Sequence, residues 1–168
     1  MINYIKVSLG IFAILAISRF VPHPPNFTSL LALTFYVPAI LGIKFLPALI
    51  LSFVITDMFV GFHNTIFFTW GSVVFIALLA KYFFKNTLSR MFGAIIGVFL
   101  FFIITNFGVW TSSGLYDYNL NGLILCYYLA LPFLMYNFIA TLIFSTIIES
   151  IYAYRNNTIK GYLKKLGI

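Results

Sequence analysis

The stretch Arg19-Phe20-Val21-Pro22-His23-Pro24-Pro25-Asn26-Phe27 lies between two apolar segments near the start of the chain. Each proline fixes φ and lacks a backbone N–H, so the stretch is predicted to be a stiff, extended link rather than a helix. The same stretch carries a guanidinium, an imidazole and an amide. A connector that only joined two helices would not need these groups. We therefore interpret the link as part of a binding site that the rest of the chain holds in place.

The composition indicates which solvent surrounds most of the chain. Of the 168 residues, 62% are hydrophobic and 8% are charged, whereas a soluble domain carries about 25% charged residues. Most of the surface must meet lipid, so we expect an integral membrane protein. The ten Lys and Arg residues are dispersed among apolar runs, which does not predict a nucleic-acid-binding face. The single cysteine excludes an internal disulfide.

Six apolar segments approach the roughly 20 residues that a membrane-spanning helix needs. They are Ile2–Ser18, Ser29–Leu41, Phe45–Val60, Ile66–Ala80, Met91–Phe107 and Gly122–Tyr152. The last is too long for one span, and Pro132 should divide it into a shallow helix near the surface and a spanning helix from about Phe133. The predicted fold is therefore all-α, a polytopic membrane protein with about six transmembrane helices in one domain, residues 1–152.

The residues after this domain, 153–168, form a short basic tail. Its apolar side chains recur at helical spacing, opposite three lysines; the two sets are Ile159, Tyr162, Leu163 and Leu166, and Lys160, Lys164 and Lys165. This pattern predicts a short amphipathic helix on the inner leaflet, near anionic head groups. A docking surface for a partner protein is the alternative.

The distribution of basic residues predicts the orientation in the membrane. If both termini lie in the cytoplasm, nine of the ten Lys and Arg residues fall on the inner side and only Arg19 on the outer side. This asymmetry follows the positive-inside rule and fits an even number of spans. We therefore expect a multi-pass protein of the cell inner (plasma) membrane. The alternative is that the first segment is a cleaved signal peptide.

With this topology the scarce polar side chains fall on the outer side. They follow the ends of the first, third and fifth apolar segments, which should therefore converge on one site. The candidate ligand-binding residues are Arg19, His23, Asn26, Asp57, His63, Asn106, Trp110 and Tyr116. We predict no catalytic residue, no resident metal and no cofactor.

Asp57 allows two interpretations, because a carboxylate near the end of a membrane helix needs a partner. In the first, Asp57 and Arg19 form a purely structural ion pair. In the second, Asp57 holds Arg19 so that the guanidinium faces an anionic ligand.

The other candidates favour recognition of an organic ligand. His23 and His63 could bind a transition metal or a metal-carrying macrocycle, but hydrogen bonding to an organic molecule is the preferred interpretation. Asn106 and Trp110 are spaced i, i+4, so on a continuous helix they share a face that suits a planar heterocycle. Tyr116 belongs to a predicted lid.

Three further residues are given structural roles. Cys126 is expected to be a small buried apolar group, and Asn137 to form an interhelical hydrogen bond near the middle of the bilayer. Glu149, at the inner end, is expected to be solvated. The chain lacks a glycine-rich phosphate loop, so it should not hydrolyse a nucleotide by itself, and it lacks hydrolase motifs such as Gly-x-Ser-x-Gly.

The quoted residues resemble an uncharacterised family of small bacterial membrane proteins described as transport proteins. The resemblance rests on four stretches: Pro22-His23-Pro24-Pro25-Asn26-Phe27, Asp57 with Gly61-Phe62-His63, Thr105-Asn106-Phe107-Gly108-Val109-Trp110, and Tyr127 with Ala130-Leu131-Pro132-Phe133. That family in turn is similar to the substrate-binding (S) components of energy-coupling factor transporters.

The S-component resemblance implies six helices with both termini inside and a vitamin or metal site beneath outer loops. It also implies two partners, a separate ATPase and a membrane scaffold subunit. S components usually carry Ala-x-x-x-Ala on the first helix for docking to that scaffold, whereas here the small residues are Gly10, Ala13 and Ala16.

Three functions are therefore considered. The preferred one is a membrane-embedded substrate-binding component for uptake of a vitamin-like small molecule at the outer face. The alternative is a non-transporting membrane scaffold subunit similar to the rod-shape protein MreD. A membrane enzyme that uses His23, His63 and Asp57 is the third, and we do not expect an enzyme.

Overall fold

The computed structural model describes the backbone of residues 2–165 and the side chains of residues 3–157, and in this range the chain folds into helices without a strand. The helices are α1 (Ile2–Phe20), α2 (Leu30–Tyr36), α3 (Leu46–Val60), α4 (Ile66–Leu79), α5 (Thr87–Ser112), α6 (Leu120–Leu129) and α7 (Leu131–Lys165). A π-helical turn, Val37–Leu41, extends α2. Short 3-10 helices, Ile43–Phe45 and Ala80–Tyr82, precede α3 and follow α4. The predicted all-α class is confirmed.

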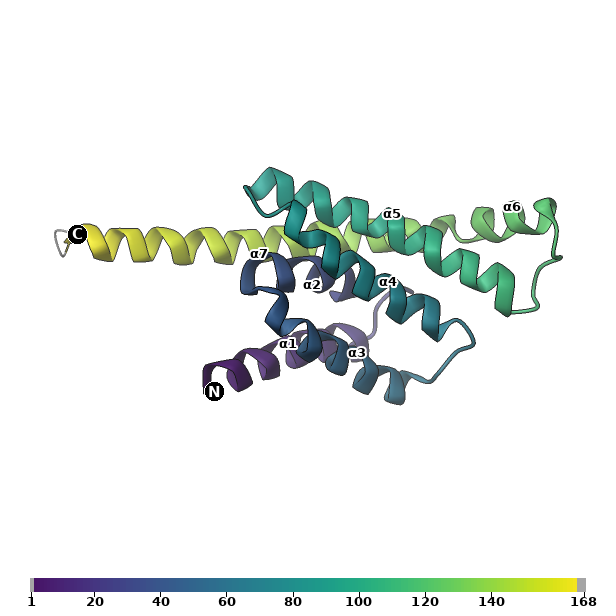
Figure 1. Ribbon diagram of the computed structural model, residues 1–168, viewed down its shortest axis with the longest axis horizontal. Coiled ribbons are helices and arrows are strands. Elements are labelled where there is room, and N and C mark those ends of the chain that lie inside the picture. Colours follow the sequence, from purple (N-terminus) through teal and green to yellow (C-terminus); the bar gives the residue numbers. More distant parts are fainter. Residues whose placement is uncertain (1, 166–168) are drawn as a thin grey trace.

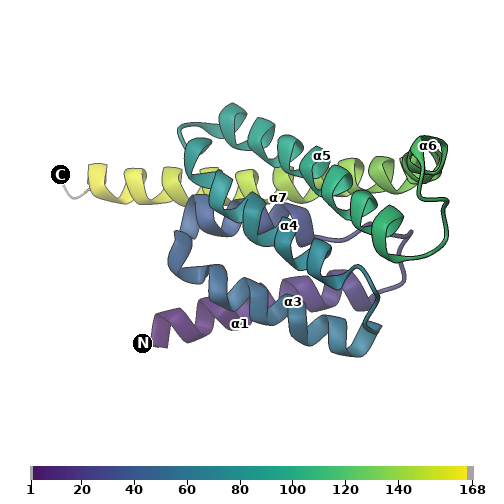
Figure 2. The same ribbon diagram turned by 45° about the vertical axis from the view of Figure 1, so that its right-hand side comes forward.

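The helices form an elongated bundle in which α1 to α5 run alternately in opposite directions and α7 returns antiparallel to α5 (Figure 1). The start of α1 and the end of α7 lie at the same end of the bundle, which we call the terminal end. The connections 21–29, 61–65 and 113–119 lie at the opposite end, which we call the loop end. Figure 2 shows α6 nearly end-on there, so α6 crosses the bundle.

The helices are of the length and composition found in membrane proteins. Four apolar helices are long enough to cross a bilayer: Asn3–Phe20, Ile43–Val60, Thr87–Ser112 and Leu131–Asn157. Three apolar helices are shorter, namely Leu30–Leu41, Ile66–Tyr82 and Leu120–Leu129. The chain is therefore a helical membrane protein. The number of six spans stays a prediction.

The proline link is shorter than the sequence predicted. Residues 21–29 are not helical, but Arg19 and Phe20 belong to the last turn of α1, because the restriction that Pro22 imposes reaches back only one residue. The Ser18 and Ser29 hydroxyls lie 2.7 Å apart, and the Ser29 N–H donates to the Ser18 hydroxyl at 3.1 Å. These bonds join the two ends of the link.

The division of the last apolar segment at Pro132 is confirmed. Helix α6 ends at Leu129 and α7 begins at Leu131, so Pro132 occupies the first turn of α7, where its missing N–H leaves no helical bond unmade. Helix α7 then continues without a break to Lys165, so the backbone of the predicted tail extends this helix. The tail side chains from residue 158 on lie outside the described part, and their amphipathic arrangement stays a prediction.

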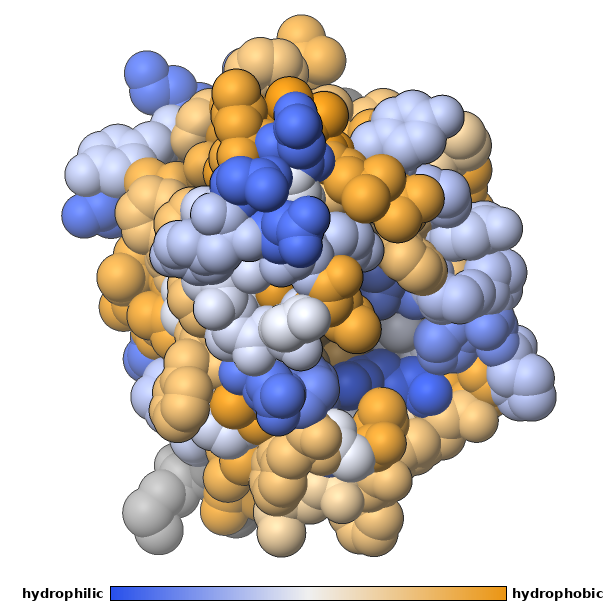
Figure 3. All heavy atoms as spheres, turned by 90° about the vertical axis from the view of Figure 1, so that its right-hand side faces the viewer, coloured by the Kyte–Doolittle hydropathy of each residue, from blue (hydrophilic) through white to orange (hydrophobic). Residues whose placement is uncertain are grey.

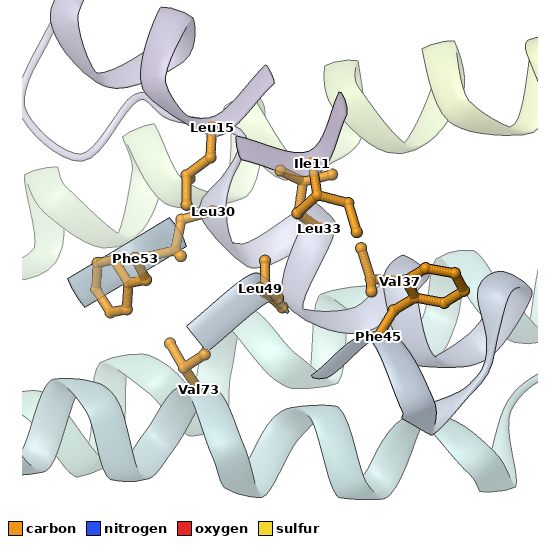
Figure 4. Close-up of a cluster of buried hydrophobic side chains, with 9 residues drawn as sticks. All are labelled: Ile11, Leu15, Leu30, Leu33, Val37, Phe45, Leu49, Phe53 and Val73. Atoms are coloured by element: carbon orange, nitrogen blue, oxygen red, sulfur yellow. The ribbon is translucent and has the colours of Figure 1, made fainter. Parts of the chain in front are cut away.

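The centre of the bundle is α2, all of whose residues are buried. It packs against α1, α3, α4, α5 and α7. Figure 4 shows the largest apolar cluster around it, in which side chains from α1, α3, α4 and the 3-10 helix before α3 meet those of α2 and its π-helical turn. The cluster consists of Ile11, Leu15, Leu30, Leu33, Val37, Phe45, Leu49, Phe53 and Val73. A segment that the sequence predicted as a short span is therefore enclosed by protein.

We predict that replacing Gly93 by alanine destabilises the bundle. A Cβ atom at position 93 of α5 would lie 2.5 Å from Cζ of Phe35 on α2 and 2.7 Å from Cβ of Phe83. Overpacking of this kind costs about 1–3 kcal/mol. Thermal unfolding of purified Gly93→Ala in detergent should therefore begin at a clearly lower temperature than for the wild type.

The matched control is Gly71→Ala, because a Cβ at position 71 of α4 meets nothing within 4 Å. Alanine is the better helix former by about 1 kcal/mol, so this variant should be as stable as the wild type or more stable. Equal melting temperatures for Gly93→Ala and Gly71→Ala would contradict the close packing of α2 on α5.

Candidate functional site

A cavity of about 600 Å³ opens at the loop end of the bundle. This volume lies within the range of roughly 300–1,000 Å³ that is typical of small-molecule sites. Figure 3 shows this end of the molecule, where hydrophilic side chains gather around a recess between apolar ones. Every helix from α1 to α7 contributes to the cavity wall.

The cavity exists because α2 is too short to fill the bundle. With its π-helical turn, α2 covers Leu30–Leu41, about 18 Å at 1.5 Å per residue, whereas the hydrocarbon core of a bilayer is about 30 Å thick. The first two residues of α2, Leu30 and Leu31, line the cavity. The cavity is therefore the part of the bundle interior beyond the start of α2.

The structure brings together most of the residues predicted for the site. Seven of the eight candidates line the cavity: Arg19, His23, Asn26, Asp57, His63, Asn106 and Tyr116. The eighth, Trp110, is not part of the lining. These residues come from three connections and three helices that are distant in sequence, as the predicted convergence of α1, α3 and α5 requires.

Arg19 and Asp57 form an ion pair in the cavity wall. Nη2 of Arg19 lies 2.6 Å from Oδ1 of Asp57, and the two side chains are 13% and 3% exposed. Nη1 of Arg19 donates to the Thr56 hydroxyl at 2.7 Å, and the guanidinium lies over the Phe53 ring, 4.8 Å from its centroid. The pair thus has a fixed geometry, and the guanidinium, with five N–H donors, retains donors that these contacts do not use.

The second oxygen of Asp57 is held by a residue that the sequence did not indicate. Nε1 of Trp70, in α4, donates to Oδ2 of Asp57 at 2.7 Å. Both carboxylate oxygens therefore have a charged or polar partner, which is what a carboxylate that is only 3% exposed needs. The sequence offered one signal for this bond, namely an indole in the middle of an apolar segment. A buried Trp usually finds an acceptor for its N–H.

The histidines lie at the mouth of the cavity and bond mainly to their own connections. Nε2 of His23 lies 3.3 Å from the Arg19 carbonyl oxygen, and Nδ1 lies 2.7 Å from that of Pro24. Nδ1 of His63 lies 2.8 Å from the Thr65 hydroxyl. Among residues 3–157, no three His, Cys, Asp or Glu side chains gather in a group that could hold a metal ion. Asn26, with φ 64°, adopts the left-handed conformation that asparagine tolerates.

Trp110 holds the third connection instead of lining the cavity. Its Nε1 donates to the Asp117 carbonyl oxygen at 3.0 Å, and its ring stacks on Tyr118 with centroids 4.4 Å apart. Asn106, one turn earlier in α5, does line the cavity and donates to the Phe102 carbonyl oxygen at 2.8 Å. The contacts of Trp110 thus hold the connection that carries Tyr116 over the cavity. Trp110 does not share a ligand-facing surface with Asn106, although the sequence had predicted that it would.

Asn137 is the polar residue of the cavity floor, a position that the sequence did not predict. It lines the cavity and is only 8% exposed. An interhelical hydrogen bond was expected, but among the described residues the Asn137 side chain has no hydrogen-bond partner. The expectation was wrong because α7 turns this face toward the cavity. The Asn137 amide faces the cavity and is not used by another side chain, so it can bond with a molecule in the cavity.

The terminal end holds a second buried ion pair, which also differs from the prediction. Nε and Nη2 of Arg90 donate to the two carboxylate oxygens of Glu149 at 2.6 and 2.7 Å, and the Thr87 hydroxyl donates to Glu149 at 3.0 Å. Glu149 was expected to be solvated, but it is only 7% exposed. The two residues are 59 positions apart, so the pairing of α5 with α7 had to be known before this bond could be predicted.

These features define the class of protein: an all-helical membrane protein with a polar cavity at one end of the bundle. Within that class, residues 2–162 match the model of a family of unknown function, DUF6580. The chain belongs to this family. No curated protein and no solved structure matches the chain.

We predict that the Arg19–Asp57 pair stabilises the bundle only as a unit. Arg19→Met or Asp57→Asn alone leaves a buried charge without its partner, which costs roughly 3–5 kcal/mol when the pair is fully buried and less beside a water-filled cavity. The double variant carries neither charge. Chemical unfolding in detergent should therefore show a loss for the double variant that is well below the sum of the two single losses.

Arg155→Met serves as the control, because Arg155 is exposed on α7 and its replacement should change stability by no more than about 0.5 kcal/mol. Additive losses for Arg19→Met and Asp57→Asn would contradict the pairing.

Proposed function

We propose that this protein is a membrane-embedded substrate-binding component, and that its cavity captures a vitamin-like small molecule for uptake. The observation that carries the proposal is the cavity itself: about 600 Å³, open at the loop end and lined by polar side chains of a chain that is otherwise mostly apolar. A polar residue inside a membrane protein is costly and usually serves a function. Here such residues converge on one space from all parts of the sequence.

The chemistry of the lining favours a ligand that is rich in hydrogen-bond acceptors. The Asp57 carboxylate is satisfied by Arg19 and Trp70, so its negative charge is already neutralised. Arg19 retains free N–H donors, and Asn137 offers an amide without a partner. We therefore propose that the ligand presents a carboxylate, a phosphate or several carbonyl groups to these side chains. In this interpretation Asp57 orients Arg19 for the ligand as well as fixing α1 on α3.

The apolar part of the lining suits a ring system. Phe53, Phe101, Phe102 and Phe133 line the cavity between the polar groups, and aromatic faces pack well against planar ligands. Tyr116, on the segment that Trp110 holds, lies in the same lining. We propose that this segment acts as the lid of the site.

The proposed topology has six spans with both termini in the cytoplasm, in the inner (plasma) membrane of a bacterium. The start of α1 and the end of α7 lie at the terminal end of the bundle (Figure 1), and the connections that carry Lys44, Lys81 and Lys85 lie there too. Arg19 is at the loop end. This separation supports the positive-inside assignment, with the loop end outside.

The proposed partners are a separate ATPase and a membrane scaffold subunit, as the similarity to S components implies. On α1, Gly10 and Ala13 are exposed, and a Cβ at position 10 would meet nothing within 4 Å. A helix of another subunit could therefore approach α1 closely at this point, as small residues permit in membranes.

We predict that Asn137→Leu removes the bound ligand without unfolding the protein. The protein should be purified from its own membranes in mild detergent and examined by native mass spectrometry. The wild type should carry an additional small-molecule mass, and Asn137→Leu should lose at least nine-tenths of it, because the apolar side chain cannot form the hydrogen bond that Asn137 offers. The melting temperature should stay close to that of the wild type.

Asn157→Leu is the matched control, since it makes the same chemical change on the same helix at an exposed position outside the cavity. It should retain the wild-type cargo. A wild-type protein that carries no small molecule, or equal cargo in Asn137→Leu and Asn157→Leu, would contradict the proposal. The first result would favour the scaffold function instead.

A further inference from the structure

Helix α7 carries a line of buried polar residues that faces the interior of the bundle. Asn137, Thr141, Ser145 and Glu149 follow one another at every fourth position and are 8%, 1%, 1% and 7% exposed. The opposite face carries isoleucines at the same spacing, and they are exposed; they are Ile139, Ile143, Ile147 and Ile151. Because four residues advance an α-helix by about 6 Å, the polar line is about 18 Å long.

Helix α2 contributes one further hydroxyl group, that of Tyr36, to the same interface. Tyr36 is 2% exposed, and α2 packs directly against α7. The Tyr36 hydroxyl lies near Ser145 and Glu149. We call the four residues Tyr36, Asn137, Thr141 and Ser145 the polar seam.

The hydroxyls of the polar seam form no hydrogen bond of ordinary length and angle. This holds for Tyr36, Thr141 and Ser145 among the described residues, although the Tyr36 hydroxyl lies close to Ser145 and Glu149. Buried polar groups without a partner are rare and costly. Three of them along one interface therefore leave hydrogen-bonding capacity that water molecules can satisfy.

Other hydroxyls on α7 show that local bonds are available to this helix. Thr146 and Ser150, which are exposed to the lipid side, each donate to the carbonyl oxygen four residues earlier at 2.8 Å. Serine and threonine commonly form this bond in membrane helices. Thr141 and Ser145 do not form it, so their hydroxyls remain available to water.

The polar seam has a polar group at each end. Asn137 lines the cavity, and the other end reaches Glu149, which the Arg90 guanidinium holds near the terminal end. The line of polar residues from Asn137 to Glu149, about 18 Å long, and the cavity next to it together account for most of the roughly 30 Å hydrocarbon thickness. The cavity and the line of polar residues thus lie one after the other along the length of the bundle.

We propose that the polar seam holds a chain of water molecules and conducts protons between the cavity and the Glu149 end. Successive hydroxyls on α7 are separated by about 6 Å along the helix, or roughly two O–H···O steps of 2.8 Å, so one water bridges each gap. Each water or hydroxyl oxygen accepts a proton on a lone pair and releases another O–H proton to the next oxygen, whereas Asn137, whose amide has no O–H proton, only hydrogen-bonds the water molecule at the cavity end. One proton crosses in each event, and no covalent bond to carbon is made or broken.

This proposal goes beyond the proposed uptake function and stands without it, because capture in the cavity does not need a path along α7. Variants of the cavity test capture, whereas variants of Thr141 and Ser145 test conduction.

The test measures proton entry into vesicles of phosphatidylcholine and phosphatidylglycerol that contain the purified full chain and a trapped pH-sensitive dye. A potassium gradient with valinomycin supplies the voltage. Wild-type vesicles should acidify at least fivefold faster than protein-free vesicles. The double variant Thr141→Val/Ser145→Ala should fall to the protein-free rate, and Thr141→Ser, which keeps a hydroxyl, should retain the wild-type rate.

The matched control is Thr146→Val/Ser150→Ala, which removes the same groups from the lipid side of the same helix and should conduct as the wild type does. Melting temperatures of both double variants show that each is folded, and the single variants Thr141→Val and Ser145→Ala should each slow conduction if the double variant is unstable. A wild type no faster than protein-free vesicles overturns the proposal. So does a seam variant as fast as the wild type, or an equal loss in both double variants.

Discussion

The burial of α2 at the centre of the bundle is the constraint on which the other features depend. A helix that is enclosed on all sides sets the distances between its neighbours, and Gly93 of α5 shows how closely one of them approaches. Because α2 begins at Leu30, after a proline link that cannot continue α1, it leaves the loop end of the bundle unfilled. The cavity, its floor and the place where Arg19 meets Asp57 all follow from this short central helix.

The two buried ion pairs divide the polar chemistry of the molecule between its ends. At the loop end, Asp57 is satisfied by Arg19 and Trp70, while the guanidinium keeps donors for the cavity. At the terminal end, Glu149 accepts both bonds of a bidentate contact from Arg90. Each pair joins two helices that are distant in sequence, which a bundle in lipid needs because apolar contact alone gives little preference for one helix neighbour over another. The pairs therefore help to specify which helices pack together.

The sequence predicted the helical class and the break at Pro132, and seven of the eight residues that it singled out line one cavity. The sequence was informative here because polar groups are scarce in this chain, so each one at the end of an apolar segment stands out. The prediction was weaker wherever the environment of a side chain depends on how its helix is rotated about its own axis. Trp70, Asn137 and Glu149 lie within apolar segments, and spacing alone does not show whether such a side chain faces lipid, a cavity or another helix. Trp110 differs because its partners, Asp117 and Tyr118, lie in an irregular connection whose path is not encoded by periodicity.

The central position of α2 also governs the order in which the protein can assemble. Helix α2 is synthesised second, yet four of the helices that pack against it, α3, α4, α5 and α7, follow later in the chain. Until α7 emerges, Tyr36 lacks the neighbours on α7 that finally enclose it. During biogenesis α2 therefore lacks some of its final neighbours at first, and the bundle is complete only when the last helix is inserted. Such late, long-range closure slows folding, so the interval before α7 is in place is the time at which α2 is least enclosed by its final neighbours.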